Sequence, residues 1–340
     1  MEIVNFLTES LKYTKVTLNY KHIRLSLFAT FIFIMIGCND DIEQVDISER
    51  PAGSIVAWGY DSHGQVSQTP AGNDFLAVSS GQRHSLALRK DGTLLAWGDD
   101  SHGLVSDAPD ADEFVAISAG NFHNLALRSD GTIIAWGRDT AGVLERKHRS
   151  SGQVTATPVT NDFVAISANG EQSWALRDDG SLIGWGLNIN NQISNKPEGN
   201  NFTAISAGHM HNIALRDDGT IAAWGDYDVL GLVSDTPEFD GFVKICAGVR
   251  HNMALRKDGS LVGWGWDLQN EVSDTPTDGA FTYISVGYTH TLAIRDNGTL
   301  VSWGWDPHDS GLVSDTPGGN GFIAISAGEM HNLAIKASEQ

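Results

Sequence analysis

The chain has 340 residues, with 22 lysines and arginines against 42 aspartates and glutamates, which gives a formal net charge of −20. A surface as acidic as this repels phosphate groups, so DNA, RNA and anionic membrane faces are disfavoured as partners. Net charge says nothing about the fold, which has to be inferred from the pattern of residues along the chain.

The first predicted element is a signal peptide, residues 1–37. Four basic residues lie between positions 12 and 24, and an apolar run of thirteen residues, 25–37, follows them. Thirteen residues cannot comfortably span a bilayer, but they fit the core of a signal peptide. The sequence Met35-Ile36-Gly37-Cys38 resembles a bacterial lipobox, which predicts that Cys38 is lipidated and becomes the mature N-terminus. An uncleaved signal anchor is the alternative, and a translation start downstream of Met1 would account for the long basic segment.

Residues 38–53 are acidic and poorly periodic, which is typical of a solvated tether. Acidic residues directly after a lipidated cysteine resemble the surface-export signals of some Gram-negative lipoproteins. The sequence therefore predicts a protein that its N-terminal lipid holds in the bacterial cell envelope. The outer membrane or the cell surface is one location consistent with this pattern, and the choice between the inner and the outer membrane stays open.

The rest of the chain, residues 54–340, is a repeat. Three strand patterns recur in it: Phe-x-Ala-Ile-Ser, then a glycine turn and His-Asn-Leu-Ala-Leu-Arg, then an Asp-Gly turn and a strand that ends at Trp-Gly. Five of the six Trp-Gly spacings are 39 or 40 residues, a period typical of propeller blades. The seven tryptophans are Trp58, Trp97, Trp136, Trp185, Trp224, Trp264 and Trp303.

The two ends of this repeat are complementary. It begins with the third strand alone, Ser54–Gly59, and ends with the first two strands alone, Phe322–Ile335. Pairing these segments would complete one blade and leave no blade with an open edge. We therefore predict an all-β fold, a closed seven-bladed β-propeller with mostly three-stranded blades whose last blade is closed by the N-terminal strand.

Residues that recur in every copy are predicted to serve the scaffold. The phenylalanines that open each first strand and the Trp-Gly tryptophans are expected to pack between blades. A histidine occupies one position in six copies, and a propeller spreads such residues around an axis instead of gathering them on one metal ion. These histidines are therefore expected to bond to turn backbone, with metal or proton chemistry as the rival interpretation. They are His84, His123, His211, His251, His290 and His331, and the seventh copy has Gln172 in a turn whose glycine is shifted.

Two further features are read in the same way. Cys246 replaces a recurrent serine and is expected to be a small buried thiol without a disulfide partner. Asx-turns explain the acidic residue that recurs after Trp-Gly. A calcium site is the alternative interpretation, and Asp226 and Asp228 are then the best remaining pair of ligands. The recurrent acidic positions are Asp61, Asp100, Asp139, Asp267 and Asp306, with Asn188 and Tyr227 in the other copies. No metal and no cofactor is expected.

The repeat as it stands at residues 114–137, FVAISAGNFHNLALRSDGTIIAWG, resembles the regulator of chromosome condensation repeat family. The resemblance covers the chain from Ser54 onward. The short repeat is more similar to the bacterial branch, which includes secreted β-lactamase-inhibitor propellers, than to the longer eukaryotic repeats. The resemblance implies a seven-bladed propeller used for protein binding. It does not carry over nucleotide exchange on a small GTPase, because nothing in this chain matches an exchange wedge.

Strand alternation places the glycine turn and the loop after Trp-Gly at the same end of each blade. Aromatic residues that do not recur lie in these segments, and aromatic anchors among polar residues are typical of interface hot spots. The predicted partner-binding residues are Tyr60, Phe122, Tyr227, Trp266, Tyr288 and Trp305. The alternative for Trp266 and Trp305 is that they extend the packing of the blades. A basic insertion, residues 143–152, either docks an acidic partner or pairs with the protein's own surface.

The function predicted from these observations is a lipid-anchored, extracytoplasmic protein-binding scaffold that uses the variable-loop end of the propeller. A carbohydrate-binding or adhesion module would use the same aromatic residues with a glycan as partner. An enzyme that acts on polysaccharide needs a separate pair of catalytic carboxylates. The acidic residues here recur by repeat symmetry or lie in turns, so the chain is not expected to be an enzyme.

Overall fold

Every segment that the repeat pattern predicts to be extended is a β-strand in the computed structural model, which describes residues 50–139, 151–225, 228–307 and 310–338. All of these strands belong to one unit, Ile32–Gln340. The other unit, Met1–Phe31, lies outside the described residues, as do Cys38 and most of the predicted tether. Among the residues described, none belongs to a helix that is long and apolar enough to cross a membrane.

The strands occupy three positions in their sheets. The inner strands begin at the recurrent phenylalanine: β2 (Phe75–Ser80), β5 (Phe114–Ala119), β8 (Phe163–Asn169), β11 (Phe202–Ala207), β14 (Phe242–Ala247), β17 (Phe281–Val286) and β20 (Phe322–Ala327). The middle strands are β3 (His84–Arg89), β6 (His123–Arg128), β9 (Gln172–Arg177), β12 (Asn212–Arg216), β15 (His251–Arg256), β18 (His290–Arg295) and β21 (His331–Ala337). The outer strands are β1 (Gly53–Gly59), β4 (Leu94–Gly98), β7 (Ile133–Gly137), β10 (Leu182–Gly186), β13 (Ile221–Trp224), β16 (Leu261–Gly265) and β19 (Leu300–Gly304), and a 3-10 turn, η3 (Ser101–Gly103), follows β4.

The strands of each sheet are antiparallel, and in the five three-stranded sheets their order follows the chain. The middle strands are buried over nearly their whole length, which explains why they read as apolar runs and not as alternating patterns. Each of the six Asp-Gly and Asn-Gly turns between middle and outer strands has its glycine at a φ between +77° and +83°. These positive angles are the reason that glycine recurs there.

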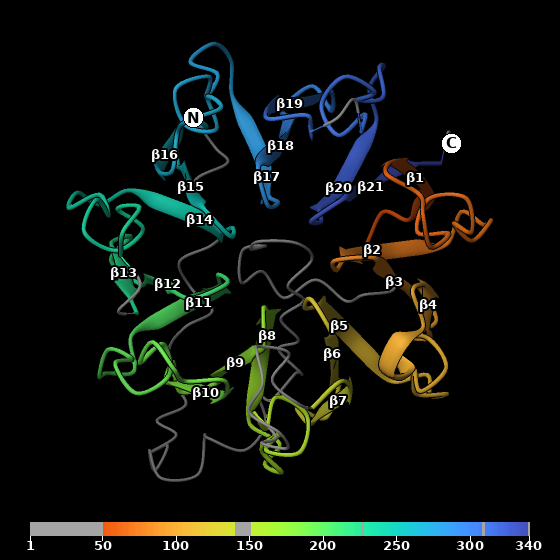
Figure 1. Cartoon of the computed structure of the whole chain (residues 1–340), viewed down its shortest axis with the longest axis horizontal. Coiled ribbons are helices and arrows are strands. Elements are labelled where there is room, and N and C mark those ends of the chain that lie inside the picture. Colours follow the sequence, from red (N-terminus) through yellow and green to blue (C-terminus); the bar gives the residue numbers. More distant parts are fainter. Residues whose placement is uncertain (1–49, 140–150, 226–227, 308–309, 339–340) are drawn as a thin grey trace, which may run out of the picture. The chain divides into compact units, whose positions relative to one another are not determined.

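The first strand closes the structure as the sequence predicts. β1 pairs with β21 over seven residue pairs, from Gly53 with Ala337 to Gly59 with His331. The resulting sheet is joined to β2 by the single pair of Gly53 with Phe75, so the order β20-β21-β1-β2-β3-β4 contains two three-stranded units. Successive inner strands contact one another, and β20 contacts β2, so these strands form a closed circle. Figure 1 shows the sheets arranged around a common centre with the inner strands nearest to it, which confirms the propeller fold.

Two circles of hydrogen bonds link neighbouring sheets. In the first, the serine near the end of each inner strand accepts the backbone N–H of the next inner strand; for example, Ser79 Oγ lies 2.9 Å from Ala119 N. The other serine links, each of 2.9 Å, join Ser118 to Ala168, Ser167 to Ala207, Ser206 to Ala247, Ser285 to Ala327 and Ser326 to Ser80. Cys246 takes the serine's place in the remaining link, where its Sγ lies 3.1 Å from Val286 N. Cys246 is disulfide-bonded, so the expectation of an unpaired thiol is wrong.

The recurrent histidines form the second circle. Each ring Nε2 lies within hydrogen-bond distance of a side chain on the next middle strand, in the pairs His84 with Asn124, His123 with Ser173, His211 with Asn252, His251 with Thr291, His290 with Asn332 and His331 with Ser85, at 2.6 to 2.8 Å. Gln172 completes the circle by donating to the Gly208 carbonyl at 2.8 Å. The expected bonds to turn backbone are therefore wrong for the histidines, because the rings point across to the next sheet and not back into their own turn.

The Trp-Gly tryptophans also join neighbouring sheets, as predicted. Each indole N–H donates to a loop carbonyl in the region before its own sheet; for example, Trp97 Nε1 lies 3.0 Å from Gln65 O and Trp136 Nε1 lies 3.1 Å from Leu104 O. All seven tryptophans are buried, so each donor would be costly to leave without an acceptor.

The sheet of β8, β9 and β10 departs from the others, as its sequence predicts. Its inner strand extends to Asn169, which pairs with Gln172 across a turn that has Gly170 at a φ of +54°. Trp174 fills the core of this sheet, where the other middle strands carry a smaller apolar residue. A Cβ on Gly184 would lie 2.6 Å from the Trp174 ring, so glycine replaces the usual alanine there.

Candidate functional site

One end of the sheets carries both variable segments, as predicted. We call it the turn face and define it by the glycine turns and the residue that follows each Trp-Gly. That residue donates its backbone N–H to the carbonyl of the residue before the recurrent histidine or glutamine. The observed pairs, at 2.8 to 2.9 Å, are Tyr60 with Met330, Asp99 with Arg83, Arg138 with Phe122, Leu187 with Glu171, Trp266 with Arg250 and Trp305 with Thr289. The backbone of this face is therefore the same from sheet to sheet, while its side chains differ.

The predicted partner-binding residues are exposed to different degrees. Tyr60 and Trp305 are exposed, with 46% and 36% of their surface accessible, whereas Phe122, Trp266 and Tyr288 are half-buried. The sixth, Tyr227, lies outside the described residues, as does most of the basic insertion 143–152. Whether any of these residues contacts a partner stays a prediction.

Trp266 and Tyr288 are brought together by a residue that the sequence analysis did not single out. The guanidinium carbon of Arg250 lies 5.8 Å from the centre of the Trp266 ring system and 4.7 Å from the centre of the Tyr288 ring. Arg250 Nη2 also donates to the Tyr288 hydroxyl at 2.8 Å. Phe122 belongs to a separate cluster, because it is covered by Arg138 at 4.9 Å. The only sequence signal for Arg250 is its variable position directly before a recurrent histidine.

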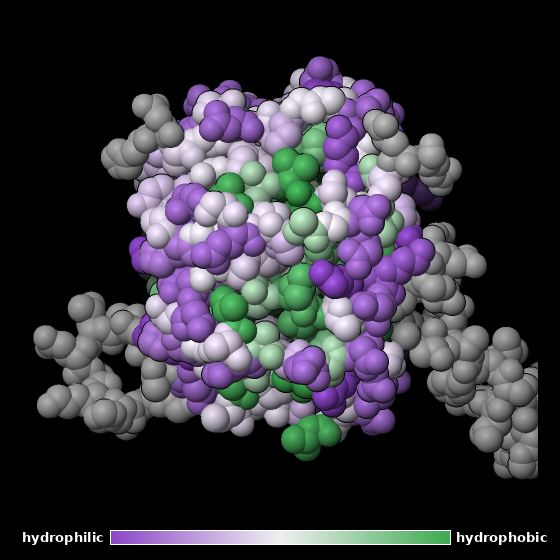
Figure 2. Space-filling model, turned by 90° about the vertical axis from the view of Figure 1, so that its right-hand side faces the viewer, coloured by the Kyte–Doolittle hydropathy of each residue, from purple (hydrophilic) through white to green (hydrophobic). Residues whose placement is uncertain are grey.

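Exposed aliphatic residues were also missed. Ile189, Val229 and Leu268 occupy the same loop position in three successive sheets and have 64%, 74% and 67% of their surface accessible. The equivalent residues after β1 and β4 are polar: they are Ser62 and Ser101, the first residue of η3. One arc of the turn face is therefore more apolar than the rest. The side of the molecule that carries β1 to β4 is mostly hydrophilic, with hydrophobic residues confined to narrow patches (Figure 2).

The acidic residues after Trp-Gly serve their own loops. Asp61 Oδ1 accepts the backbone N–H groups of Val66 and Ser67, five and six residues on, and not the one two residues on that an Asx-turn requires. Asp228, and not Tyr227, takes this role in its copy, accepting from Val233 and Ser234. The Asx-turn interpretation is therefore wrong for these residues. It holds instead for the Asp-Gly turns, where Asp91, Asp130, Asp179, Asp218, Asp258 and Asn297 accept the N–H two residues on.

The same hydrogen bonds set the charge states of the turn face. Burial acts to raise the pKa of Asp306, but hydrogen bonds from Ser314, Ser310 and Leu312 outweigh it and lower the pKa to about 2. Burial raises the pKa of Glu329, which is only partly offset by its hydrogen bond from Gln82. Both of these carboxylates are thus already hydrogen-bonded within the protein.

Two small cavities lined by described residues lie near the centre of the ring. A cavity of about 80 Å³ is lined by the serines and alanines at the ends of the inner strands, and a second of about 50 Å³ lies among the glycine turns beside Tyr288 and Glu329. Pockets for small molecules usually measure roughly 300–1,000 Å³. These cavities suit water and not a substrate. Over the part of the chain that the structure describes, no group of three or more histidine, cysteine or acidic side chains could hold a metal ion.

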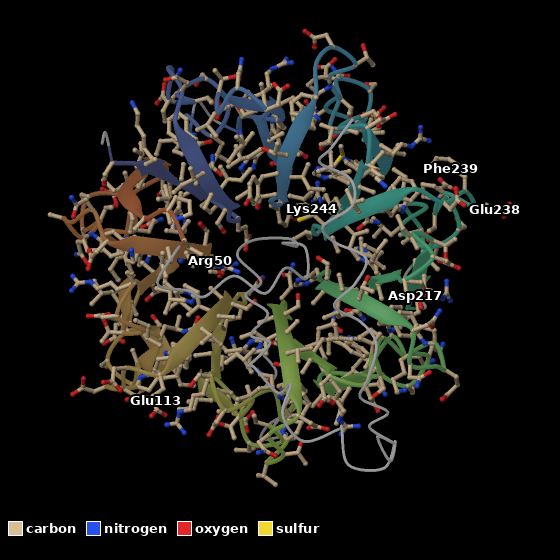
Figure 3. All side chains as sticks on the ribbon, turned by 180° about the vertical axis from the view of Figure 1, so that it is seen from behind. Arg50, Glu113, Asp217, Glu238, Phe239 and Lys244 are labelled. Carbon is tan, nitrogen blue, oxygen red and sulfur yellow. The ribbon has the colours of Figure 1, made fainter. Side chains whose placement is uncertain are left out.

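Two inner strands also depart from the repeat near the centre. Their third residue is alanine in the other five strands, but it is Lys244 in β14 and Tyr283 in β17. Lys244 is buried, and its Nζ lies 4.1 Å from the centre of the Tyr283 ring. Figure 3 shows Lys244 near the centre of the ring, whereas Glu238 and Phe239 lie at its outer edge. The pair fills space between two sheets that small alanines fill elsewhere.

Comparison with known families and structures gives a consistent result. Four segments, residues 75–104, 114–143, 242–270 and 281–309, match the model of the regulator of chromosome condensation (RCC1) repeat. Among curated proteins, none matches the chain closely enough to count as a sequence relative.

Solved structures share the fold at low identity. The crystal structure of Prp20p from Saccharomyces cerevisiae matches with a TM-score of 0.70 and 17% identity, over 89% of this chain and 94% of that chain. Yeast RCC1 (Prp20) in its complex with Kap60 matches with a TM-score of 0.70 and 17% identity, over 96% and 97%. Human WBSCR16 matches with a TM-score of 0.66 and 15% identity, over 86% and 100%. At these identities the likeness establishes the fold alone.

Proposed function

Because the chain carries RCC1 repeats on a β-propeller, we propose that it is a protein-binding scaffold and that its partner binds the turn face. The similar yeast propeller Prp20p is described with binding properties to Gsp1p and histones, and it has been crystallised bound to Kap60. These partners belong to that protein. What this chain shares with it is the fold, and loops positioned by a rigid scaffold are where proteins usually carry binding function.

One observation carries the proposal. Each residue after Trp-Gly has the same backbone hydrogen bond in its sheet, yet the six described side chains at this position are tyrosine, aspartate, arginine, leucine and two tryptophans. A role in the blades themselves would favour one residue type, as it does for the buried tryptophans. Constant backbone with varied side chains is the arrangement expected of a surface used for recognition.

We further propose that this scaffold is lipid-anchored through Cys38, works in the bacterial cell envelope and has no catalytic activity. Because the chain has two cysteines, acylation of Cys38 would leave Cys246 without its disulfide. The lipobox-like sequence before Cys38 supports the anchor. The use of recurrent acids in loop and turn hydrogen bonds, and the small size of the central cavities, support binding over catalysis. The anchor is tested by mass spectrometry of the mature protein, where a diacylglycerol-modified N-terminal cysteine and a free Cys246 thiol are expected. An intact N-terminus, or a disulfide between the two cysteines of the chain, would contradict the anchor.

The scaffold is tested by affinity capture from the source organism's envelope. The protein is compared with a double variant, Tyr60→Ala with Trp305→Ala, and with the control Val159→Ala, which removes a fully exposed apolar side chain away from the turn face. A protein retained by the wild type and the control, but not by the double variant, is the expected result. Equal retention by all three, or retention of glycans in place of protein, would refute the proposal.

A further inference from the structure

The cluster of Arg250, Trp266 and Tyr288 on the turn face combines the three residue types that dominate interface hot spots. Arg250 is half-buried between two aromatic side chains that come from different sheets, since Trp266 follows β16 and Tyr288 precedes β18. Its hydrogen bond to the Tyr288 hydroxyl fixes one edge of the guanidinium. The group is thus held in one orientation before any partner arrives, which lowers the entropy cost of binding.

The arginines of the described turn face differ in what faces them. Arg83 lies in the electrostatic field of two carboxylates, Asp99 and Glu329. Arg138 is stacked on Phe122 and lies 3.8 Å from a carboxylate oxygen of Glu171. In the part of the chain that the structure describes, no carboxylate oxygen lies within 4.0 Å of the Arg250 side chain.

Arg138 shows what an arginine stacked on an aromatic ring binds on this face. Its guanidinium uses one side for the ring of Phe122 and turns toward the carboxylate of Glu171, which the next sheet supplies. Arg250 has the same stacking but lacks the acid. Asp267, which follows Trp266 in the sequence, is engaged by the backbone N–H groups of Val272 and Ser273. Guanidinium is planar, weakly hydrated and matched to carboxylates, so an arginine prepared in this way favours an anionic oxygen pair.

Resting on the proposed function, we infer that Arg250 binds a carboxylate of the protein partner, and that the partner places apolar side chains on either side of it. Leu268, two residues after Trp266, is exposed. Trp305 is also exposed, and its backbone N–H donates to the carbonyl of Thr289, the residue after Tyr288. The cluster therefore fits an acidic side chain within an otherwise apolar segment. Such a segment is complementary to this spot although the protein as a whole is strongly acidic.

Two matched peptides test the charge requirement directly. The probes are Ac-Leu-Glu-Leu-NH2 and Ac-Leu-Gln-Leu-NH2, which differ only in the carboxylate. The readout is the arginine Nε–H signals of the nitrogen-labelled wild-type protein, with the Arg250 signal assigned from its loss in Arg250→Lys. We expect the Glu peptide to shift the Arg250 signal with at least about tenfold higher affinity than the Gln peptide, and to leave the Arg138 signal in place. Equal responses to the two peptides, or no response to either, would overturn the inference.

A capture experiment separates this inference from the proposed function. Arg250→Gln is compared with Arg83→Gln, and the fold of both variants is checked by thermal unfolding. Loss of the partner from Arg250→Gln but not from Arg83→Gln supports the carboxylate site. Capture by Arg250→Gln at wild-type level, with loss on Tyr60→Ala and Trp305→Ala, would refute the site and leave the scaffold proposal standing.

Discussion

Acidification should unfold the propeller in a pH range where its carboxylates are still ionised. Burial lowers the pKa of His123, His251 and His331 to about 3, and of His211 and His290 to about 4. These rings are fully buried. Protonation would place a charge and a new N–H where the structure offers no acceptor, because the Nδ1 atom of each ring has no hydrogen-bond partner among the described residues.

The sign of the effect follows from proton binding. An unfolded histidine titrates near pH 6.5, whereas the folded ring resists protonation down to about pH 3 or 4. Below pH 6.5 the unfolded state therefore binds more protons, and stability falls as the pH falls. Between pH 7 and pH 5 each histidine costs about 2 kcal/mol, so five independent groups cost on the order of 10 kcal/mol. That is comparable to the whole free energy of unfolding of a typical domain, roughly 5–15 kcal/mol.

Urea unfolding followed by tryptophan fluorescence at pH 7.5, 6.5, 5.5 and 5.0 measures this loss. The lowered pKa of Asp306 and of the turn aspartates affects the free energy of unfolding only below about pH 4. The raised pKa of Glu329 increases stability as the pH falls, but it is one group against five histidines. His102 is exposed, so His102→Asn should leave the pH dependence unchanged. A midpoint that is constant from pH 7.5 to 5.0 would refute the argument, because it would mean that the circle of histidines accepts protons without cost.

The remaining predictions concern packing and closure. Trp97→Phe removes a buried indole N–H and leaves a loop carbonyl without its donor. We expect the free energy of unfolding to fall by about 1–3 kcal/mol, measured by urea unfolding at pH 7.5. An unchanged midpoint would contradict the inter-sheet role of the tryptophans. Gly208→Ala should lower the free energy of unfolding by about 1–3 kcal/mol, because the new Cβ would lie 2.3 Å from the His211 ring. The control is Gly318→Ala, whose Cβ meets nothing within 4 Å and which should be neutral. Equal effects of the two substitutions would refute the tight packing at Gly208. Deleting β1 exposes the edge of β21, so size-exclusion chromatography should show oligomers or aggregates, and a stable monomer would show that closure by β1 is dispensable.

The sequence was sufficient for the fold because each repeat carries its own strand and turn signals. The spacing of Trp-Gly predicted the propeller, and the incomplete repeats at the two ends predicted the pairing of β1 with β21. The partners of recurrent side chains were harder to predict. His84 bonds to Asn124 of the next sheet, a contact that depends on how two sheets pack and that no local pattern records.

The candidate site was likewise predictable in its position but not in its side-chain contacts. Repeat alternation placed both variable segments at one end correctly, because this depends only on strand direction. The grouping of Trp266 with Tyr288 could not be predicted, because it is created by Arg250, a single residue between two sheets. An isolated arginine in a sequence carries no sign of whether an acid faces it, and this is decided by the neighbouring sheet.

The pairing of β1 with β21 has a consequence for how the protein is made. β1 leaves the ribosome before all the other described strands, and its partner leaves after them. During synthesis the growing chain can form sheets one after another from local contacts, but β1 has no middle strand to join until the end. Among the strand pairings described, the closing step therefore carries the largest loop entropy, and it is the slow step expected in refolding.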